Sequence, residues 1–274
     1  MNPSQFCELT YEVDEGVAVV TLNRPEKRNL WSGPMAVEYR WALHHADQDP
    51  AARVVVVTGA GSNFCAGADV AGLEAISDGN GAYEKERAAL PPPPPDAPPA
   101  LRHNHTAPLA IGVPVIAAIE GACAGAGFVV ATYTDLRLVS ATAKVTTAFA
   151  RFGLPAEYGI GWLLPRLVGI PNALDLLYDT RTRSGAEVAA VGWAQLHPAG
   201  EVLGAAVGLA RRLARESSPQ SLRTMKRQVF VGAAGDLDDA YRRSVEDMNA
   251  ALAHPDLRVG IRAQRRKSAP DFLA

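Results

Sequence analysis

Cysteine is scarce in this sequence, and the cysteines that occur form no pattern. Three are present, Cys7, Cys65 and Cys123, which is an odd number, and none has the CxxC or CxxH spacing of a zinc site. They argue against a disulfide framework and against structural zinc. They are typical of a reducing cytosol, so we expect a cytoplasmic location.

Long apolar runs and an excess of charge of one sign are also missing. No stretch of eighteen apolar residues occurs, so we expect no membrane span. The opening residues MNPSQFCELTYEV lack the cationic start and apolar core of a leader peptide. The 27 basic and 29 acidic residues leave a formal net charge of −2, and no basic cluster is interleaved with aromatic residues. Nucleic-acid binding is therefore not expected.

Apolar residues are plentiful enough for a sizeable core, at 48% of 274 residues. Alternating apolar residues predict a hairpin over residues 6–22. Ser32 is expected to cap a helix that follows, and apolar runs at 53–59 and 114–120 predict buried strands. Strand, helix and strand in this order indicate right-handed crossovers and a parallel sheet.

Helical patterns dominate from Gly161 onward. The chain is therefore expected to fold as an α/β protein with a β/α core over residues 1–200 and a helical C-terminal region over residues 201–274. A proline-rich segment at about 78–113 interrupts the core and predicts an excursion across the surface. It could be a plain spacer or a lid that turns His103 or His105 toward a ligand.

Two glycine-rich stretches follow the two buried strands. GSNFCAGADV occupies residues 61–70, and GACAGAG occupies residues 121–127. Glycines let the chain turn and let a ligand approach the main chain, although each stretch could also be an ordinary connection to a helix. Two backbone amides that point at one oxygen form an oxyanion hole, which stabilises the negative charge of a thioester becoming an enolate.

Four segments together resemble the crotonase, or enoyl-CoA hydratase/isomerase, superfamily. They are TLNRPEKRN at 21–29, FCAGADV at 64–70, GACAGAGFVVATYTDLRL at 121–138 and LPAEYGIGWLLPRLVG at 154–169. The resemblance implies a ββα superhelix with two roughly perpendicular sheets and a C-terminal trimerisation region. It also implies a homotrimer or hexamer that acts on an acyl-CoA thioester without a metal or a redox cofactor.

Carried over residue by residue, the resemblance places the oxyanion amides on Ala68 and Ala126. Relatives usually have glycine at the second position, so Ala126 is a departure, although alanine keeps its N–H. The residues that the resemblance assigns to coenzyme A and substrate are Arg28, Ala66, Gly67, Asp69, Val70, Gly125, Phe149 and Lys267.

The two glutamates of a typical hydratase are missing, because their positions are Val129 and Phe149. Neither side chain can move a proton. Glu157 is the acid left near the site, at a position where some isomerases and dehalogenases of the superfamily have a functional carboxylate. An apolar pocket with Phe128, Phe149 and Trp162 would raise the pKa of Glu157 and suit it to shuttle a proton. Double-bond isomerisation is therefore favoured.

Other assignments stay open from the residues alone. Glu157 could activate water for hydration, helped by His103, His105 or Tyr158, or it could serve a hydrolase or lyase of the superfamily. It could instead be a helix-capping or surface carboxylate. In that case the chain would be a CoA-ester-binding protein without catalysis.

Overall fold

The computed structural model describes residues 1–69, 89–95, 97–232 and 236–273. The strands are β1 Leu9–Asp14, β2 Val17–Leu22, β3 Val54–Gly59, β4 Val115–Ile119, β5 Ala122–Ala124, β6 Leu136–Ser140, β7 Lys144–Thr146, β8 Arg183–Ser184 and β9 Gln195–His197. The α-helices are α1 Gly33–Gln48, α4 Ala107–Ala110, α5 Ala126–Thr132, α6 Ile160–Val168, α7 Ile170–Tyr178, α8 Gly185–Ala190, α9 Val202–Glu216, α10 Pro219–Gly232, α11 Leu237–Ala253 and α12 Pro255–Arg266. Short 3-10 helices are η1 Pro3–Gln5, η2 Pro25–Lys27, η3 Pro99–Leu101 and η4 Phe149–Phe152.

The larger sheet has six strands in the order β1-β2-β3-β4-β6-β9. The predicted hairpin is confirmed, because β1 and β2 pair antiparallel. From β2 onward the neighbouring strands are parallel, as the crossovers require. β9 at the far edge was not predicted, because three residues are too few to show an alternating pattern.

A second sheet of three short strands has the order β5-β7-β8. Two of its strands were missed in the sequence. β5 lies inside the second glycine-rich stretch, and β8 has only two residues before α8. These segments are extended because they pair with strands distant in the sequence. Their own residues have no strong preference for the strand conformation.

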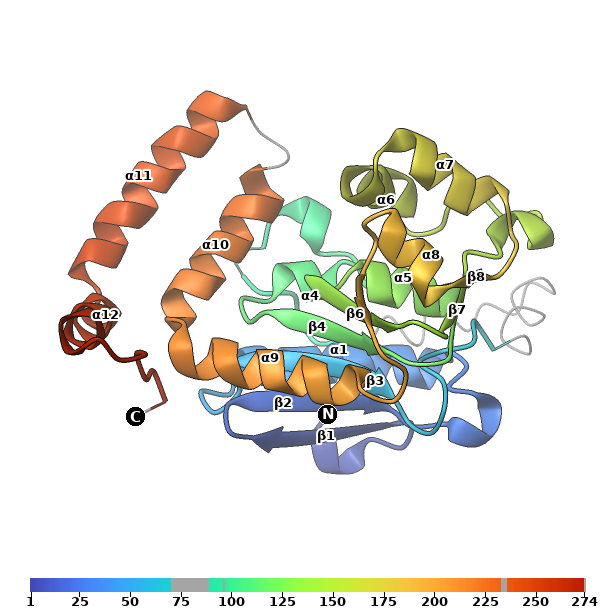
Figure 1. Ribbon diagram of the computed structural model, residues 1–274, viewed down its shortest axis with the longest axis horizontal. Coiled ribbons are helices and arrows are strands. Elements are labelled where there is room, and N and C mark those ends of the chain that lie inside the picture. The colour runs from blue at the N-terminus through green and yellow to red at the C-terminus, as the bar shows by residue number, and fades with distance from the viewer. Residues whose placement is uncertain (70–88, 96, 233–235, 274) are drawn as a thin grey trace.

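The two faces of the larger sheet are covered by different helices (Figure 1). Val55 and Val57 of β3 belong to the core cluster that includes α1, whereas Val54 and Val56 belong to the cluster with α9. This alternation follows from the two-residue period of a strand. Ser32 caps α1 as predicted, since its side chain accepts a hydrogen bond from the amide of Met35 at 3.1 Å.

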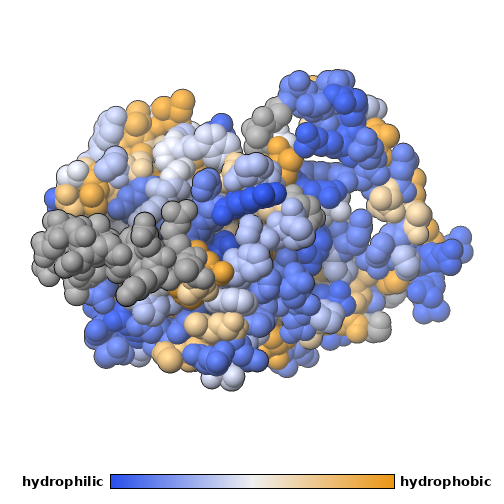
Figure 2. Space-filling model, turned by 180° about the vertical axis from the view of Figure 1, so that it is seen from behind, coloured by the Kyte–Doolittle hydropathy of each residue, from blue (hydrophilic) through white to orange (hydrophobic). Residues whose placement is uncertain are grey.

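The C-terminal helices extend away from the sheets. α10, α11 and α12 lie on one side of the molecule, and α6, α7 and α8 lie on the other (Figure 1). α11 exposes large apolar side chains along its length: Leu237, Tyr241, Val245, Met248 and Leu252. In Figure 2, hydrophobic side chains also gather over the α6 and α7 side of the molecule.

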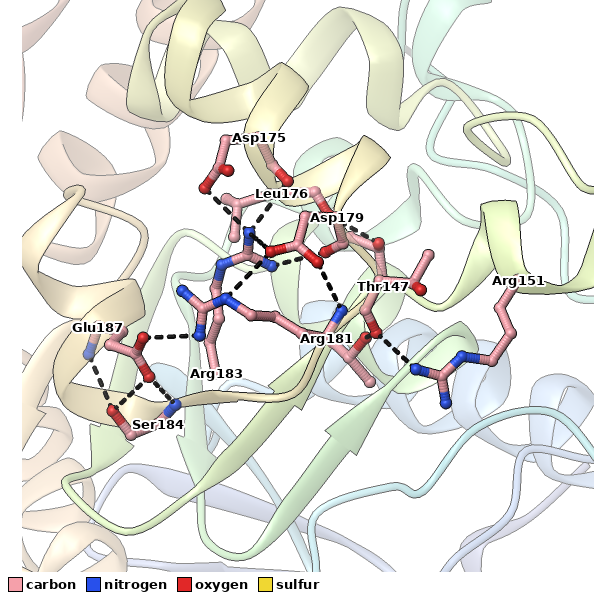
Figure 3. Close-up of polar contacts among 11 residues, drawn as sticks. Thr147, Arg151, Asp175, Leu176, Asp179, Arg181, Arg183, Ser184 and Glu187 are labelled. Carbon is pink, nitrogen blue, oxygen red and sulfur yellow. Dashed lines mark hydrogen bonds and ion pairs between the residues drawn. The ribbon is translucent and has the colours of Figure 1, made fainter.

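Ion pairs fasten α7 to the smaller sheet (Figure 3). The buried Arg183 of β8 donates to Asp175 of α7 at 2.9 Å and to Asp179 at 3.3 Å. Arg181 bridges Asp179 and Glu187, a residue of α8. Since β8 pairs with β7 and β7 pairs with β5, this network holds the sheet that carries the second glycine-rich stretch.

Candidate functional site

The two glycine-rich strand ends lie side by side and are joined by main-chain hydrogen bonds. The amide of Cys65 donates to the carbonyl of Ala122 at 2.9 Å, and the amide of Ala124 donates to the carbonyl of Cys65 at 3.0 Å. Cys65 and Cys123 thereby form a parallel bridge. The separation of the two stretches is therefore fixed by backbone geometry.

Two glycines are required for this close approach. A Cβ atom on Gly127 would lie 2.4 Å from the carbonyl oxygen of Cys65, which is too close for any residue that has a Cβ atom. Gly121 has φ +56°, and a Cβ atom there would lie 1.9 Å from the carbonyl oxygen of Ser62. Glycine at these positions lets the second stretch pack directly on the first.

The amides of Ala68 and Ala126 stand at the ends of these two stretches. The amide of Trp31 donates to the carbonyl of Gly67 at 2.8 Å, and the amide of Asp69 donates to the carbonyl of Trp31 at 2.9 Å. These two hydrogen bonds flank Ala68 and do not use its amide. Ala126 is the first residue of α5, where an amide has no partner within the helix. Among the described residues, neither amide donates to a backbone carbonyl outside its own element.

Two asparagines that the sequence analysis did not single out hold the first stretch. The buried Asn29 has φ +54° and donates to the carbonyls of Ala60 and Asn63 at 2.9 and 2.7 Å. The side chain of Asn63 accepts from the amide of Ala122 at 3.0 Å. A signal was present in the motif TLNRPEKRN, because asparagine tolerates positive φ better than most residues.

The residues assigned to coenzyme A are partly gathered around the first stretch. Arg28 is exposed, and its carbonyl accepts from the amide of Ala66 at 3.1 Å. The carboxylate of Asp69 is already engaged, because it pairs with Arg24 at 3.1 Å. Val70 lies outside the described residues.

Lys267 belongs to the C-terminal helices and not to the two glycine-rich stretches. It is exposed and closes α12, on the opposite side of the molecule from α6 to α8 (Figure 1). Gly125, by contrast, precedes α5 and lies close to Gly67: a Cβ atom on Gly125 would be 3.9 Å from the Cα atom of Gly67.

Glu157 is half-buried in the segment before α6, and burial raises the pKa of its carboxyl group. Its carbonyl accepts from the amide of Ile160, but no side-chain hydrogen bond caps α6. The structure therefore does not support the helix-cap interpretation. The raised pKa agrees with the expected direction.

The aromatic residues expected around Glu157 have neighbours of their own. Phe128 is fully buried and stacks on Trp193 with ring centroids 4.8 Å apart. Trp162 is 44% exposed and lies beneath the guanidinium of Arg166. Phe149 is buried at the start of η4. The pocket of three aromatic residues around Glu157 therefore stays a prediction.

A cavity of about 560 Å³ borders the segment that carries Glu157. Tyr158 and Gly159 line it, together with His103 and His105. His105 stacks on Tyr158 with ring centroids 3.7 Å apart, and the hydroxyl of Tyr133 donates to the Tyr158 carbonyl. The end of the proline-rich segment thus forms one wall of this cavity.

Within the part of the chain that the structure describes, no group of three His, Cys, Asp or Glu side chains could hold a metal ion. No helix among the same residues is long and apolar enough to cross a membrane.

Comparison with solved structures identifies the class of fold. An enoyl-CoA hydratase from Polaromonas sp. JS666 superposes with a TM-score of 0.83, at 26% sequence identity, over 96% of this chain and 98% of that one. The two proteins therefore share the crotonase fold.

Sequence comparison then identifies the family. The family described as enoyl-CoA hydratase/isomerase matches residues 12–273. A Thermus thermophilus protein named "Putative enoyl-CoA hydratase" is 34% identical over 95% of this chain and 99% of its own length. The 1,2-epoxyphenylacetyl-CoA isomerase of Escherichia coli is 29% identical over 95% of this chain and 96% of its own length. A Rhodobacter capsulatus protein named "Probable enoyl-CoA hydratase" is 37% identical over 66% of this chain, and the match spans 65% of its own length.

This chain belongs to the enoyl-CoA hydratase/isomerase family and is an enzyme of that family. Enzymes of this family are lyases or isomerases that act on CoA thioesters, in general without a further cofactor.

Proposed function

We propose that the enzyme binds an acyl-CoA thioester with its carbonyl oxygen between the amides of Ala68 and Ala126 and stabilises the enolate form of that thioester. The observation that carries the proposal is the main-chain pairing of the two glycine-rich strand ends, which holds both amides at a fixed separation. Donors positioned in advance stabilise the charge that develops in the transition state without reorganising.

Glu157 is the proposed sole acid and base. Val129 and Phe149, which replace the two glutamates of a typical hydratase, are both buried and apolar. The Glu157 carboxylate would take a proton from one carbon of the acyl group and return it to another, so that the double bond migrates. This chemistry needs one carboxylate of raised pKa, which matches the half-buried position of Glu157.

The alternative is hydration, with Glu157 activating a water molecule that adds across the double bond. His103 and His105 favour this alternative in one respect, because they line the cavity beside Tyr158 and could orient a water molecule. A CoA-ester-binding protein without catalysis is not proposed, because the chain is an enzyme of its family and such a protein would leave the paired amides without a reaction to assist.

The coenzyme A part of the substrate is proposed to lie along Arg28, Ala66, Gly67 and Gly125, with the buried Phe149 behind it. Asp69 would act through its backbone, since its side chain pairs with Arg24. The cation of Lys267, at the C-terminal end of α12, is proposed to meet the CoA phosphates.

An isotope experiment tests the enolate and separates the two reactions. Incubated in heavy water, a saturated acyl-CoA should exchange hydrogen at the carbon next to the thioester, because the enolate is reprotonated from solvent. An enoyl-CoA should then give a product of unchanged composition apart from deuterium if isomerisation occurs, or a product with one added water if hydration occurs. Mass spectrometry distinguishes these products, and failure to exchange or convert any thioester of a broad panel would contradict the enolate proposal.

The enzyme is further proposed to form a homotrimer or a hexamer. α11 exposes five large apolar side chains from Leu237 to Leu252, more than an isolated helix normally leaves in water. Closed symmetry would bury these faces between copies. Sedimentation velocity at micromolar concentration should give three or six times the mass of 29.0 kDa, and a monomer would refute the assignment.

A further inference from the structure

The lining of the cavity next to the Glu157 segment indicates which kind of acyl group the enzyme binds. This inference rests on the proposed function above. Tyr158 and Gly159 line the cavity and directly follow Glu157 in the chain. An acyl group whose carbonyl is held by the amides of Ala68 and Ala126 would pass Glu157 and enter this cavity. The lining therefore selects the acyl group.

The described lining is rich in apolar and aromatic side chains. It consists of Pro98, Ala100, Leu101, His103, His105, Thr106, Leu109, Tyr133, Tyr158, Gly159, Trp162, Phe230 and Val231. No Lys, Arg, Asp or Glu occurs among these described residues. Burial, assisted by the nearby Arg40 guanidinium, lowers the pKa of His105 to about 4, so its imidazole is neutral at neutral pH. A carboxylate or an amine on the acyl group would lose its hydration without gaining a partner.

The cavity is also too large for a short acyl chain. A carbon group of an acyl chain fills roughly the 30 Å³ that one water molecule takes in the liquid, so a four-carbon acyl group would fill roughly 120 Å³. The cavity of about 560 Å³ is within the usual range for drug-sized ligands. A larger, apolar acyl group fits it better.

Aromatic side chains from four separate segments form much of the wall. Tyr133 follows α5, Tyr158 precedes α6, Phe230 is in α10, and His105 lies before α4. The hydroxyl of Tyr133 is engaged by the Tyr158 carbonyl, and burial raises the pKa of Tyr133 to about 12. These residues thus present rings, and rings favour other rings through stacked and edge-to-face contacts.

We propose that the enzyme acts on an uncharged, ring-containing acyl-CoA, and that Phe230 is a residue that determines this specificity. Phe230 is half-buried on α10, one helical turn beyond Lys226, whose side chain anchors that helix to the core. Phe230 also packs against the buried core cluster, and this packing limits the motion of its ring before a ligand arrives and reduces the entropic cost of ring binding.

The test compares two saturated thioesters with nine acyl carbons each, 3-phenylpropanoyl-CoA and nonanoyl-CoA, by isothermal titration calorimetry on the full-length protein. Neither has a double bond to react, so binding is measured apart from catalysis. A cavity that is merely apolar would favour the nonanoyl chain, which has more apolar surface to bury. We expect the phenyl compound to bind about threefold to tenfold more tightly, the gain typical of one aromatic contact.

Two variants test whether Phe230 causes the preference for the phenyl compound. Phe230→Leu should abolish most of it while nonanoyl-CoA affinity changes by less than about twofold, since leucine keeps apolar volume without a ring. Tyr178→Leu, at the exposed end of α7, is the matched control and should keep the preference. Equal affinities in the unmodified protein, or an unchanged preference in Phe230→Leu, would overturn the inference and leave the enolate proposal intact. Failure of both thioesters to bind would also overturn the inference, whereas the enolate proposal depends on the exchange experiment with the broad panel of thioesters.

Discussion

Replacing Glu157 by glutamine is expected to lower turnover of the preferred enoyl-CoA by about 10²-fold or more, the scale of a general base. Glutamine has the same shape but cannot accept and return a proton. The affinity for the thioester should change little, because the coenzyme A part is held at other residues. A steady-state assay with a separate binding titration measures both quantities.

The pH dependence of activity is an independent test of the role of Glu157. Burial raises the pKa of Glu157, so the unmodified enzyme should lose activity on acidification at a higher pH than an ordinary glutamate would cause. Glu216→Gln at the exposed end of α9 is the control and should keep both rate and profile. Val129→Glu should not create an efficient hydratase, because the partner position is Phe149. Full turnover in Glu157→Gln would show that the assignment is wrong, and His103, His105 and Tyr158 would be the next residues to test.

Replacing Lys226 by methionine is expected to lower the free energy of unfolding by about 3 to 5 kcal/mol. Lys226 is buried in α10 and pairs with Asp135 at 2.7 Å, and it also donates to the carbonyls of Pro108 and Val113. Methionine would leave the buried Asp135 carboxylate without its cation. Chemical denaturation followed by circular dichroism measures the change.

The pH dependence of the stability loss in Lys226→Met tests whether the unpaired Asp135 carboxylate causes it. Burial already raises the pKa of Asp135, and loss of Lys226 would raise it further. A carboxyl group with a raised pKa in the folded state costs stability as pH rises above its unfolded pKa, so the defect should shrink on acidification. Adding Asp135→Asn should restore part of the loss. Arg211→Met, which removes exposed ion pairs with Asp14 and Glu15, should cost at most about 1 kcal/mol. An equal cost in both variants would contradict the argument.

The fold was predictable where the pattern was local. The hairpin, the Ser32 cap and the buried strands at β3 and β4 follow from alternation, capping chemistry and apolar runs, and the structure confirms them. The four motifs in order also gave the family correctly. Each of these features is encoded within a few neighbouring residues.

The features that depend on distant contacts were not predictable in the same way. β5 is extended because its main chain forms hydrogen bonds with Cys65 of the first glycine-rich stretch. β8 is extended because it pairs with β7. The ion pair of Asp69 with Arg24 joins residues far apart in sequence. The stacking of His105 on Tyr158 needs the chain to return from the proline-rich segment, which no local pattern specifies.

The donors proposed for the oxyanion hole belong to the main chain, and this affects how the site can vary over evolution. Any residue other than proline offers an N–H at positions 68 and 126, so alanine in place of glycine at Ala126 costs the site nothing in chemistry. The strict requirement falls instead on Gly127, where a Cβ atom would strike the Cys65 carbonyl. What the packing requires is therefore a spacing between two strand ends. Side chains that face the acyl group are free to diverge with each new substrate.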